Sequence, residues 1–239
     1  MIWGQKQYLN SYQYKLWQTT GLLHLLVLSG QNITLLVGFF NILVKKWGIK
    51  WQLVVTLLVA SFYLVVFGSE PPIIRSCLMA ILSALVLYQQ TTTPPLYLLF
   101  LTSATMLFFK PEWLTSLSFQ LSFGATLGIL WFYPIFQAKY KFKSELAMMF
   151  FVSLSAQIFS TPLLLIYFRQ ISLLVLPINV VVGLVVEPIM LVGVLTSLSA
   201  LALPILTPVF SLVLFGLLSL LNLLVENAYP LSMLFQLRI

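Results

Sequence analysis

The chain is poor in the residues from which most enzyme active sites are built. Only 7% of its 239 residues are charged, and it has one histidine and one cysteine. A lone His24 and a lone Cys77 argue against a zinc or two-metal site, and one cysteine cannot form an intrachain disulfide. The sequence also lacks the Gly-x-Ser-x-Gly turn of hydrolases and the Gly-x-x-x-x-Gly-Lys-Ser/Thr phosphate loop. We therefore expect no catalytic residue, no metal and no cofactor.

What the chain has in abundance is hydrophobic side chains. They make up 61% of the sequence. Charged residues make up only 7%, whereas soluble domains carry about 25%. This composition indicates a membrane protein with many spans. The net charge is +7, and most lysines fall in short gaps between apolar runs, where they act first as topology signals and lipid-headgroup contacts.

The expected fold is all-α: a polytopic bundle of about eight or nine spans with some broken or interfacial helices. An interfacial segment at 1–20 precedes a transmembrane domain at 21–225, and a short interfacial segment at 226–239 follows. Prolines and charged gaps place the spans near 21–44, 52–67, 73–88, 96–109, 113–136, 146–168, 171–187, 189–203 and 209–225.

Two lysine-rich loops predict the orientation. They lie at 45–50 and 137–143, and four expected spans separate them, so both face the same side. The positive-inside rule places that side in the cytoplasm. The amino terminus is then outside, although Lys6 and Lys15 oppose this assignment.

The first apolar run holds more polar groups than a simple span needs. His24, Ser29, Gly30, Gln31 and Asn32 interrupt it, and His24 and Gln31 fall on one helical face at about 100° per residue. Polar groups in hydrocarbon usually face a protein interior or a water-filled path. Two roles stay open: hydrogen bonds between neighbouring helices, or the lining of a pathway.

Further polar residues occur in later spans. Arg75, just after two prolines, either extends to the interface or binds phosphate through its planar guanidinium. Glu187 is followed by Pro188, which we expect to break the helix. It is spaced four residues from Gly183 and eight from Asn179. At membrane depth it would pair with a cation such as Arg75 or His24, or bind a proton or cation.

Two spans carry small and amide residues at intervals of four. Ser116, Gln120, Gly124 and Gly128 form one such stripe, and Ser153, Gln157 and Thr161 form another. Small residues spaced in this way normally allow close helix packing. We assign the glycines to packing, whereas Gln120 fits either packing or a pathway.

Four blocks in order resemble the membrane domain of the ComEC-type competence family. The family signature, close to Gly-Leu-x-His-Leu-Leu-Ala-x-Ser-Gly-x-His-Ile, is similar to residues 21–33. The blocks Pro72–Met79 and Phe119–Ala125 resemble its arginine helix and its Phe-Gln-Leu-Ser-Phe block. Its last conserved stretch is similar to Gln157, Thr161-Pro162, Phe168, Asn179 and Pro188.

The resemblance implies a channel that passes single-stranded DNA across the bacterial cytoplasmic membrane during natural transformation. It also implies separate DNA-receptor, nuclease and motor proteins as partners, besides membrane lipid, and it leaves a homo-oligomer open. The pathway candidates are then His24, Ser29, Gly30, Gln31, Asn32, Arg75, Gln120, Gln157 and Asn179. The candidates for packing or gating are Gly124, Gly128, Gly183, Glu187 and Pro188.

Two features depart from the family pattern. Asn32 stands where the family usually has a second histidine, and an amide cannot take up a proton. Family members also carry an outer OB-like domain and a metallo-β-lactamase-like domain, neither of which is recognisable here. A transporter or channel for a small solute, or a truncated family member that does not conduct, are therefore the alternatives.

Overall fold

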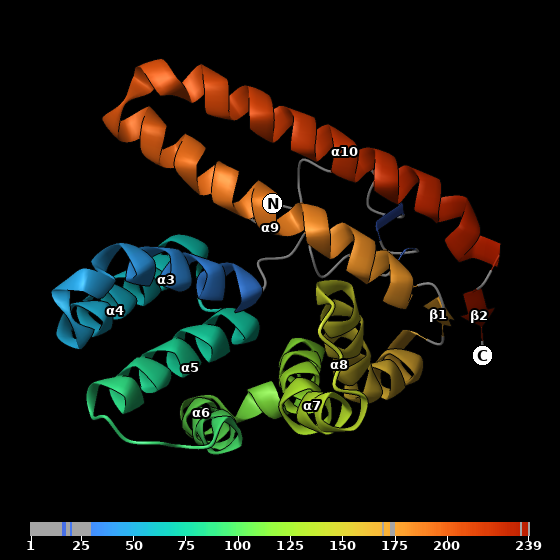
Figure 1. Ribbon diagram of the computed structural model, residues 1–239. Coiled ribbons are helices and arrows are strands. Elements are labelled where there is room, and N and C mark those ends of the chain that lie inside the picture. Colours follow the sequence, from blue (N-terminus) through green and yellow to red (C-terminus); the bar gives the residue numbers. More distant parts are fainter. Residues whose placement is uncertain are drawn as a thin grey trace. The chain divides into compact units, whose positions relative to one another are not determined.

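The structure is a computed structural model that describes residues 16–17, 20, 30–168, 170–172, 175–234 and 236–238 (Figure 1). The chain divides into two compact units, and we describe each by itself. Unit 1 comprises Met1–Val27, Phe142–Leu154 and Leu164–Ile239, and unit 2 comprises Leu28–Lys141 and Ser155–Leu163. Helix α8 (Glu145–Phe168) contributes residues to both units.

Unit 2 consists mainly of consecutive apolar helices joined by short turns. They are α3 (Gly30–Val44), α4 (Ile49–Phe67), α5 (Pro71–Tyr88), α6 (Pro95–Phe109) and α7 (Leu117–Tyr140). Two 3-10 turns, η2 (Lys45–Trp47) and η3 (Pro111–Thr115), follow α3 and α6. The sharp turn between α3 and α4 uses Gly48 at a φ of 96°, a conformation that costs glycine little.

Helices α3, α4 and α5 pack against one another around the main core of unit 2. Five buried residues from these helices form this core: Ile33, Ala60, Tyr63, Ile73 and Cys77. Lipid tails are as apolar as these side chains, so close packing rather than transfer from water must stabilise such a contact in a membrane.

Helices α7 and α8 approach closely within unit 2. Gly128 is buried, and a Cβ atom placed on it would overlap the carbonyl oxygen of Ser155. One turn earlier, a Cβ on Gly124 would lie 3.5 Å from Cβ of Phe159, which is ordinary contact. Only glycine therefore fits at Gly128, whereas Gly124 has room for a methyl group.

Unit 1 is dominated by a hairpin of two long helices, α9 (Val175–Ala202) and α10 (Thr207–Leu234), with the 3-10 turn η4 (Pro204–Leu206) between them. The two helices run side by side (Figure 1). Their buried side chains are mainly aliphatic: Val182, Val186, Ile189 and Met190 on α9, and Leu221 and Val225 on α10. The Ser199 and Thr207 hydroxyl oxygens lie 3.2 Å apart where the chain turns.

A short antiparallel ladder ties the end of α10 back to the segment before α9. Strand β1 (Gln170–Ser172) pairs with β2 (Gln236–Arg238), with Ile171 opposite Leu237. We expected an all-α chain with an interfacial segment at 226–239. The structure is α-helical apart from this ladder, and α10 continues through residue 226 to Leu234.

Six helices among the described residues are long and apolar enough to cross a membrane: α4, α5, α7, α8, α9 and η4–α10 together. The expected eight or nine spans are not confirmed. The described part of α3 and the whole of α6 have 15 residues each. Such a helix is roughly 23 Å long, which is shorter than the roughly 30 Å hydrocarbon core.

The expected helix break at Pro188 is wrong. Helix α9 continues through Pro188 for 28 residues, so the separate spans predicted at 171–187 and 189–203 are one helix. Proline removes one N–H donor from the helix, but membrane helices tolerate this loss because neighbouring groups can satisfy the released carbonyl. Helices α7, α8 and α10 also contain an internal proline each.

Candidate functional site

The clearest polar contact between two helices of unit 2 is made by Arg75. It is the fifth residue of α5, where the helix begins with Pro71 and Pro72. Its side chain is partly buried, and its Nε donates a hydrogen bond of 2.7 Å to the hydroxyl oxygen of Ser122 on α7. The bond joins the early turns of the two helices, so Arg75 is held between helices rather than left without a protein partner.

The guanidinium keeps most of its hydrogen-bonding capacity. Its Nη1 lies 3.7 Å from Sδ of Met79, a weak acceptor one turn further along α5. Arginine has five N–H donors, so these two contacts leave three without an acceptor among the residues that the structure describes. A planar cation with donors on one side is suited to bidentate recognition of phosphate or carboxylate.

Ser116 and Gln120 make hydrogen bonds that fix the start of α7. The Ser116 hydroxyl accepts a hydrogen bond of 3.2 Å from the Phe119 backbone N–H, which makes Ser116 the N-cap of α7. The expected helical stripe therefore begins one turn later than we predicted. Gln120 donates from Nε2 to the Leu114 carbonyl oxygen at 2.9 Å, so its amide fastens the η3 turn to the helix.

The structure describes only part of the first polar run. His24 and Ser29 lie outside the described residues, and Gly30 is the first residue of α3. Gln31 is helical, but its side chain is also outside the described part. Asn32 is 6% exposed and therefore lies inside unit 2.

Two other pathway candidates have buried amide atoms. Nε2 of Gln157 is buried in α8 and has no hydrogen-bond partner among the described residues. In unit 1, Asn179 donates from Nδ2 to the Ser153 hydroxyl at 3.4 Å, while its Oδ1 is buried and meets no hydrogen-bond partner in the part of the chain that the structure describes. Unpaired buried amide groups are uncommon in proteins and call for an explanation such as water or a polar ligand.

The packing and gating candidates differ in their surroundings. A Cβ on Gly128 would overlap α8, whereas a Cβ on Gly183 would meet nothing within 4 Å. Because α9 is continuous through Pro188, Glu187 lies near the middle of its 28 residues and is partly buried. Its expected partner His24 lies outside the described residues, and Arg75 belongs to the other unit.

The sequence-predicted site residues thus do not converge on one described cluster. The partner that the sequence analysis missed is Ser122, which holds Arg75. Ser122 lies in the Phe-Gln-Leu-Ser-Phe block that carries the family resemblance, and this block was the signal that could have selected it.

Six membrane-capable helices with few charges define the class: a helical membrane protein. A family model described as "Competence protein" matches residues 1–236. The chain therefore belongs to the competence protein family, as the four sequence blocks predicted.

Two relatives show how the chain compares with longer proteins. ComE operon protein 3 of Bacillus subtilis is 30% identical over 182 residues, which is 74% of this chain and 23% of that protein. An uncharacterized protein of Aquifex aeolicus is 32% identical over 205 residues, or 85% of this chain and 42% of that protein. The chain thus spans less than half the length of either relative. No solved structure matches it.

Proposed function

We propose that the chain forms part of the route by which single-stranded DNA crosses the bacterial cytoplasmic membrane during natural transformation. Membership of the competence family supports the process, and Arg75 is the observation that supports the ligand. A strand that passes through a protein presents phosphates regularly, whatever its sequence. A guanidinium with unused N–H donors can bind those phosphates without distinguishing between bases.

The buried amides of unit 2 fit the same role. Gln157 carries an unpaired Nε2 in an otherwise apolar helix, and an amide can bond water or the sugar–phosphate backbone without adding a fixed charge. Few fixed charges are an advantage for passage, since a strand held by many lysines would be released slowly. The scarcity of cations among these polar residues therefore supports a conduit rather than a tight-binding receptor.

In this proposal the protein is multi-pass, and the 15-residue helix α6 also crosses a locally thinned membrane. Four spans then separate the loops at 45–50 and 137–143, and both loops face the cytoplasm by the positive-inside rule. The chain is not itself an enzyme. DNA capture, strand degradation and the driving motor then reside in other polypeptides or domains, and a homo-oligomer is compatible with the proposal.

A second candidate function is passage of a small solute, and Glu187 is the observation that favours it. A carboxylate near the middle of a 28-residue apolar helix is expensive and commonly marks a proton or ion site. It would also repel phosphates on a nearby strand. DNA passage therefore requires Glu187 to lie away from the strand, whereas solute passage requires it in the path.

The test uses a naturally transformable host that carries this gene. We expect its deletion to abolish transfer of labelled DNA into the cytoplasm, the wild-type gene to restore it, and Arg75→Ala to restore it at least roughly tenfold less well. Gly183→Ala is the matched control, because a Cβ there meets nothing within 4 Å. Undiminished uptake in the deletion strain overturns the proposal.

Glu187→Gln separates the two candidate functions. The amide is nearly the same size but has no charge, so DNA uptake should stay within about twofold of wild type if Glu187 lies away from the strand. Loss of a proton-coupled or cation-coupled solute flux in proteoliposomes, together with unchanged DNA uptake, would favour the solute function instead.

A further inference from the structure

The turn between α3 and α4 carries a group of cationic and aromatic side chains. Lys45, Lys46, Trp47, Lys50 and Trp51 form this group, which we call the basic–aromatic tip. It contains two Lys-Trp pairs four residues apart. All five residues are exposed, with Trp47 59% and Trp51 50% exposed, and none of the residues between Lys45 and Trp51 is acidic.

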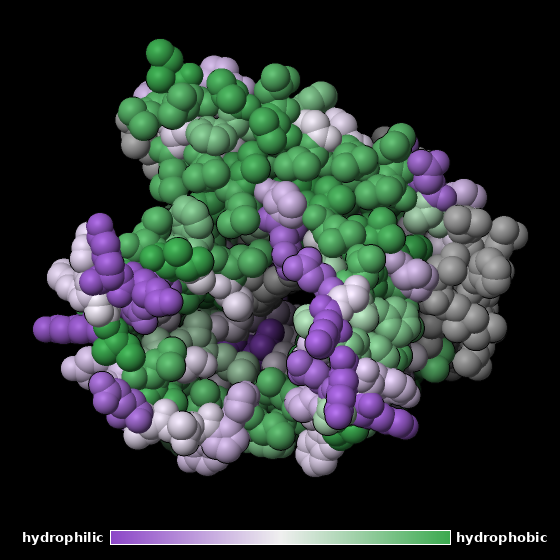
Figure 2. All heavy atoms as spheres, in the orientation of Figure 1, coloured by the Kyte–Doolittle hydropathy of each residue, from purple (hydrophilic) through white to green (hydrophobic). Residues whose placement is uncertain are grey.

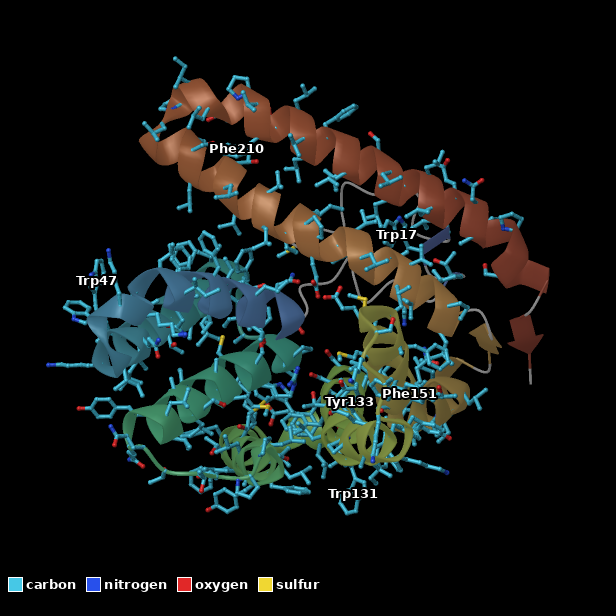
Figure 3. All side chains as sticks on the ribbon, in the orientation of Figure 1. Trp17, Trp47, Trp131, Tyr133, Phe151 and Phe210 are labelled. Carbon is cyan, nitrogen blue, oxygen red and sulfur yellow. The ribbon has the colours of Figure 1, made fainter. Side chains whose placement is uncertain are left out.

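The local backbone explains why these side chains gather. The 3-10 turn η2 ends at Trp47, Gly48 reverses the chain, and α4 begins at Ile49. This geometry places Trp51 one helical turn beyond the reversal. Figure 3 shows Trp47 at the end of the α3–α4 pair, and Figure 2 shows hydrophilic residues gathered at that end beside a largely hydrophobic surface.

The two indoles form an open surface rather than a closed stack. Their ring centroids lie 6.1 Å apart with an interplanar angle of 69°, so the rings meet edge to face. Nζ of Lys46 lies 5.7 Å from the centroid of the Trp47 ring, which is within cation–π range. Each ring keeps exposed area, and three ammonium groups lie on the same short turn.

We propose that the basic–aromatic tip is a binding surface for single-stranded DNA where the strand leaves the membrane on the cytoplasmic side. Proteins that bind single strands without sequence preference combine cations for phosphates with aromatic rings on which bases stack. The tip supplies both. The inference rests on the proposed function for the identity of the strand and its direction.

Anionic phospholipid is the competing occupant, because tryptophan and lysine also occur at membrane interfaces. A lipid headgroup would contact the lysines, and a tryptophan ring would lie at the membrane interface. A headgroup has no flat aromatic surface that could stack on the indoles. Two half-exposed indoles offer ring surface on which planar bases can stack. The nucleic acid is therefore the occupant that uses every feature of the tip.

The experiment measures binding of a fluorescein-labelled oligothymidylate to the full chain in nanodiscs of phosphatidylcholine. Trp47→Ala/Trp51→Ala should weaken binding roughly tenfold or more, because the variant loses the rings on which two bases would stack. Lys45→Gln/Lys46→Gln/Lys50→Gln should weaken it too and reduce the slope of log affinity against log salt by about two. Trp47→Phe/Trp51→Phe should retain most of the binding, because phenylalanine also stacks.

Matched controls come from the same chain. Trp113, which lies 5.0 Å below Nζ of Lys110, is another tryptophan–lysine pair, and Trp113→Ala should leave affinity unchanged. Lys139→Gln/Lys141→Gln/Lys143→Gln removes the same charge from the exposed end of α7 and the loop after it, and should alter affinity less than the tip variant. Helix content and monodisperse elution establish that each variant is folded.

Three results would overturn the inference. Equal affinity in the double-alanine variant shows that the indoles do not stack with bases. Equal loss in the second lysine loop shows a general charge effect. A shift of tryptophan fluorescence on adding phosphatidylglycerol to the nanodiscs, without any shift on adding oligothymidylate, assigns the tip to lipid if Trp47→Phe/Trp51→Phe removes that shift, since the chain has six tryptophans. A deletion strain with normal uptake would instead overturn the proposed function, even if the tip binds the oligonucleotide.

Discussion

Two helix contacts in this protein are built in different ways. In unit 2, α5 and α7 are joined by the Arg75–Ser122 hydrogen bond, and the next contact along, between α7 and α8, depends on Gly128. In unit 1, α9 and α10 bury mainly aliphatic side chains along a hairpin, and a Cβ on Gly183 would meet nothing. One region is held by a few specific groups, and the other by many interchangeable ones.

The difference indicates where function is most sensitive. Aliphatic contacts in a membrane tolerate substitution, because a similar volume packs almost as well. A charge-assisted bond between helices or a glycine against a backbone carbonyl has no such substitute. The four predictions below test this contrast, beginning with the largest effect.

The largest effect is expected for Gly128→Leu, with Gly183→Leu as the comparison. Gly128→Leu places a side chain against the Ser155 carbonyl oxygen, and overpacking of this kind should destabilise the protein by about 3 kcal/mol or more. Gly183→Leu should change stability by less than about 1 kcal/mol. Thermal unfolding in detergent, followed by the loss of monodisperse protein, compares them. Equal melting temperatures would remove the contrast between the two regions.

A large effect on uptake but not on folding is expected for Arg75→Lys. Lysine keeps the charge but presents a single ammonium in place of a planar fork, so it cannot bind phosphate in a bidentate manner. We expect DNA uptake between the wild-type level and that of Arg75→Ala, with a nearly unchanged melting temperature. Full activity with lysine would show that charge alone is sufficient and that the Ser122 bond has no role in orientation.

A smaller effect is expected for Ser122→Ala. It removes the acceptor for Nε of Arg75 and should cost about 1 kcal/mol of stability, with a partial loss of uptake as the guanidinium loses its orientation. Thr126→Val is the control one turn away, because the Thr126 hydroxyl donates to the Ser122 carbonyl oxygen within its own helix. Equal effects of the two substitutions on uptake would argue against the interhelical bond.

The smallest effect is expected for Pro188→Ala. Alanine restores the backbone N–H that the Leu184 carbonyl oxygen lacks, and α9 is already continuous at this position. Melting temperature should rise slightly, by the equivalent of about 1 kcal/mol or less, and uptake should not change. A marked loss of uptake would show that Pro188 matters for gating rather than for helix geometry.

Much of the helical pattern could be predicted from the sequence. The predicted segments at 73–88, 96–109 and 146–168 lie within two residues of α5, α6 and α8, because prolines and charged gaps end apolar helices for local reasons. The family blocks likewise predicted the competence family correctly.

The errors have identifiable physical causes. Pro188 does not end α9, because the cost of one lost hydrogen bond depends on the surroundings of the helix rather than on proline alone. Ser116 caps α7 instead of continuing a stripe, because the chain makes a 3-10 turn before it. The β1–β2 ladder joins segments more than sixty residues apart, and neither three-residue strand carries a recognisable pattern.

The sequence by itself determined that this is a helical membrane protein of the competence family, since composition, proline positions and motif order are local properties of the chain. Only the tertiary structure decided which polar residues meet. It paired Arg75 with Ser122 and placed Gly128 against Ser155. Such pairings depend on how helices pack in space, and periodicity along a single helix carries no information about its neighbour.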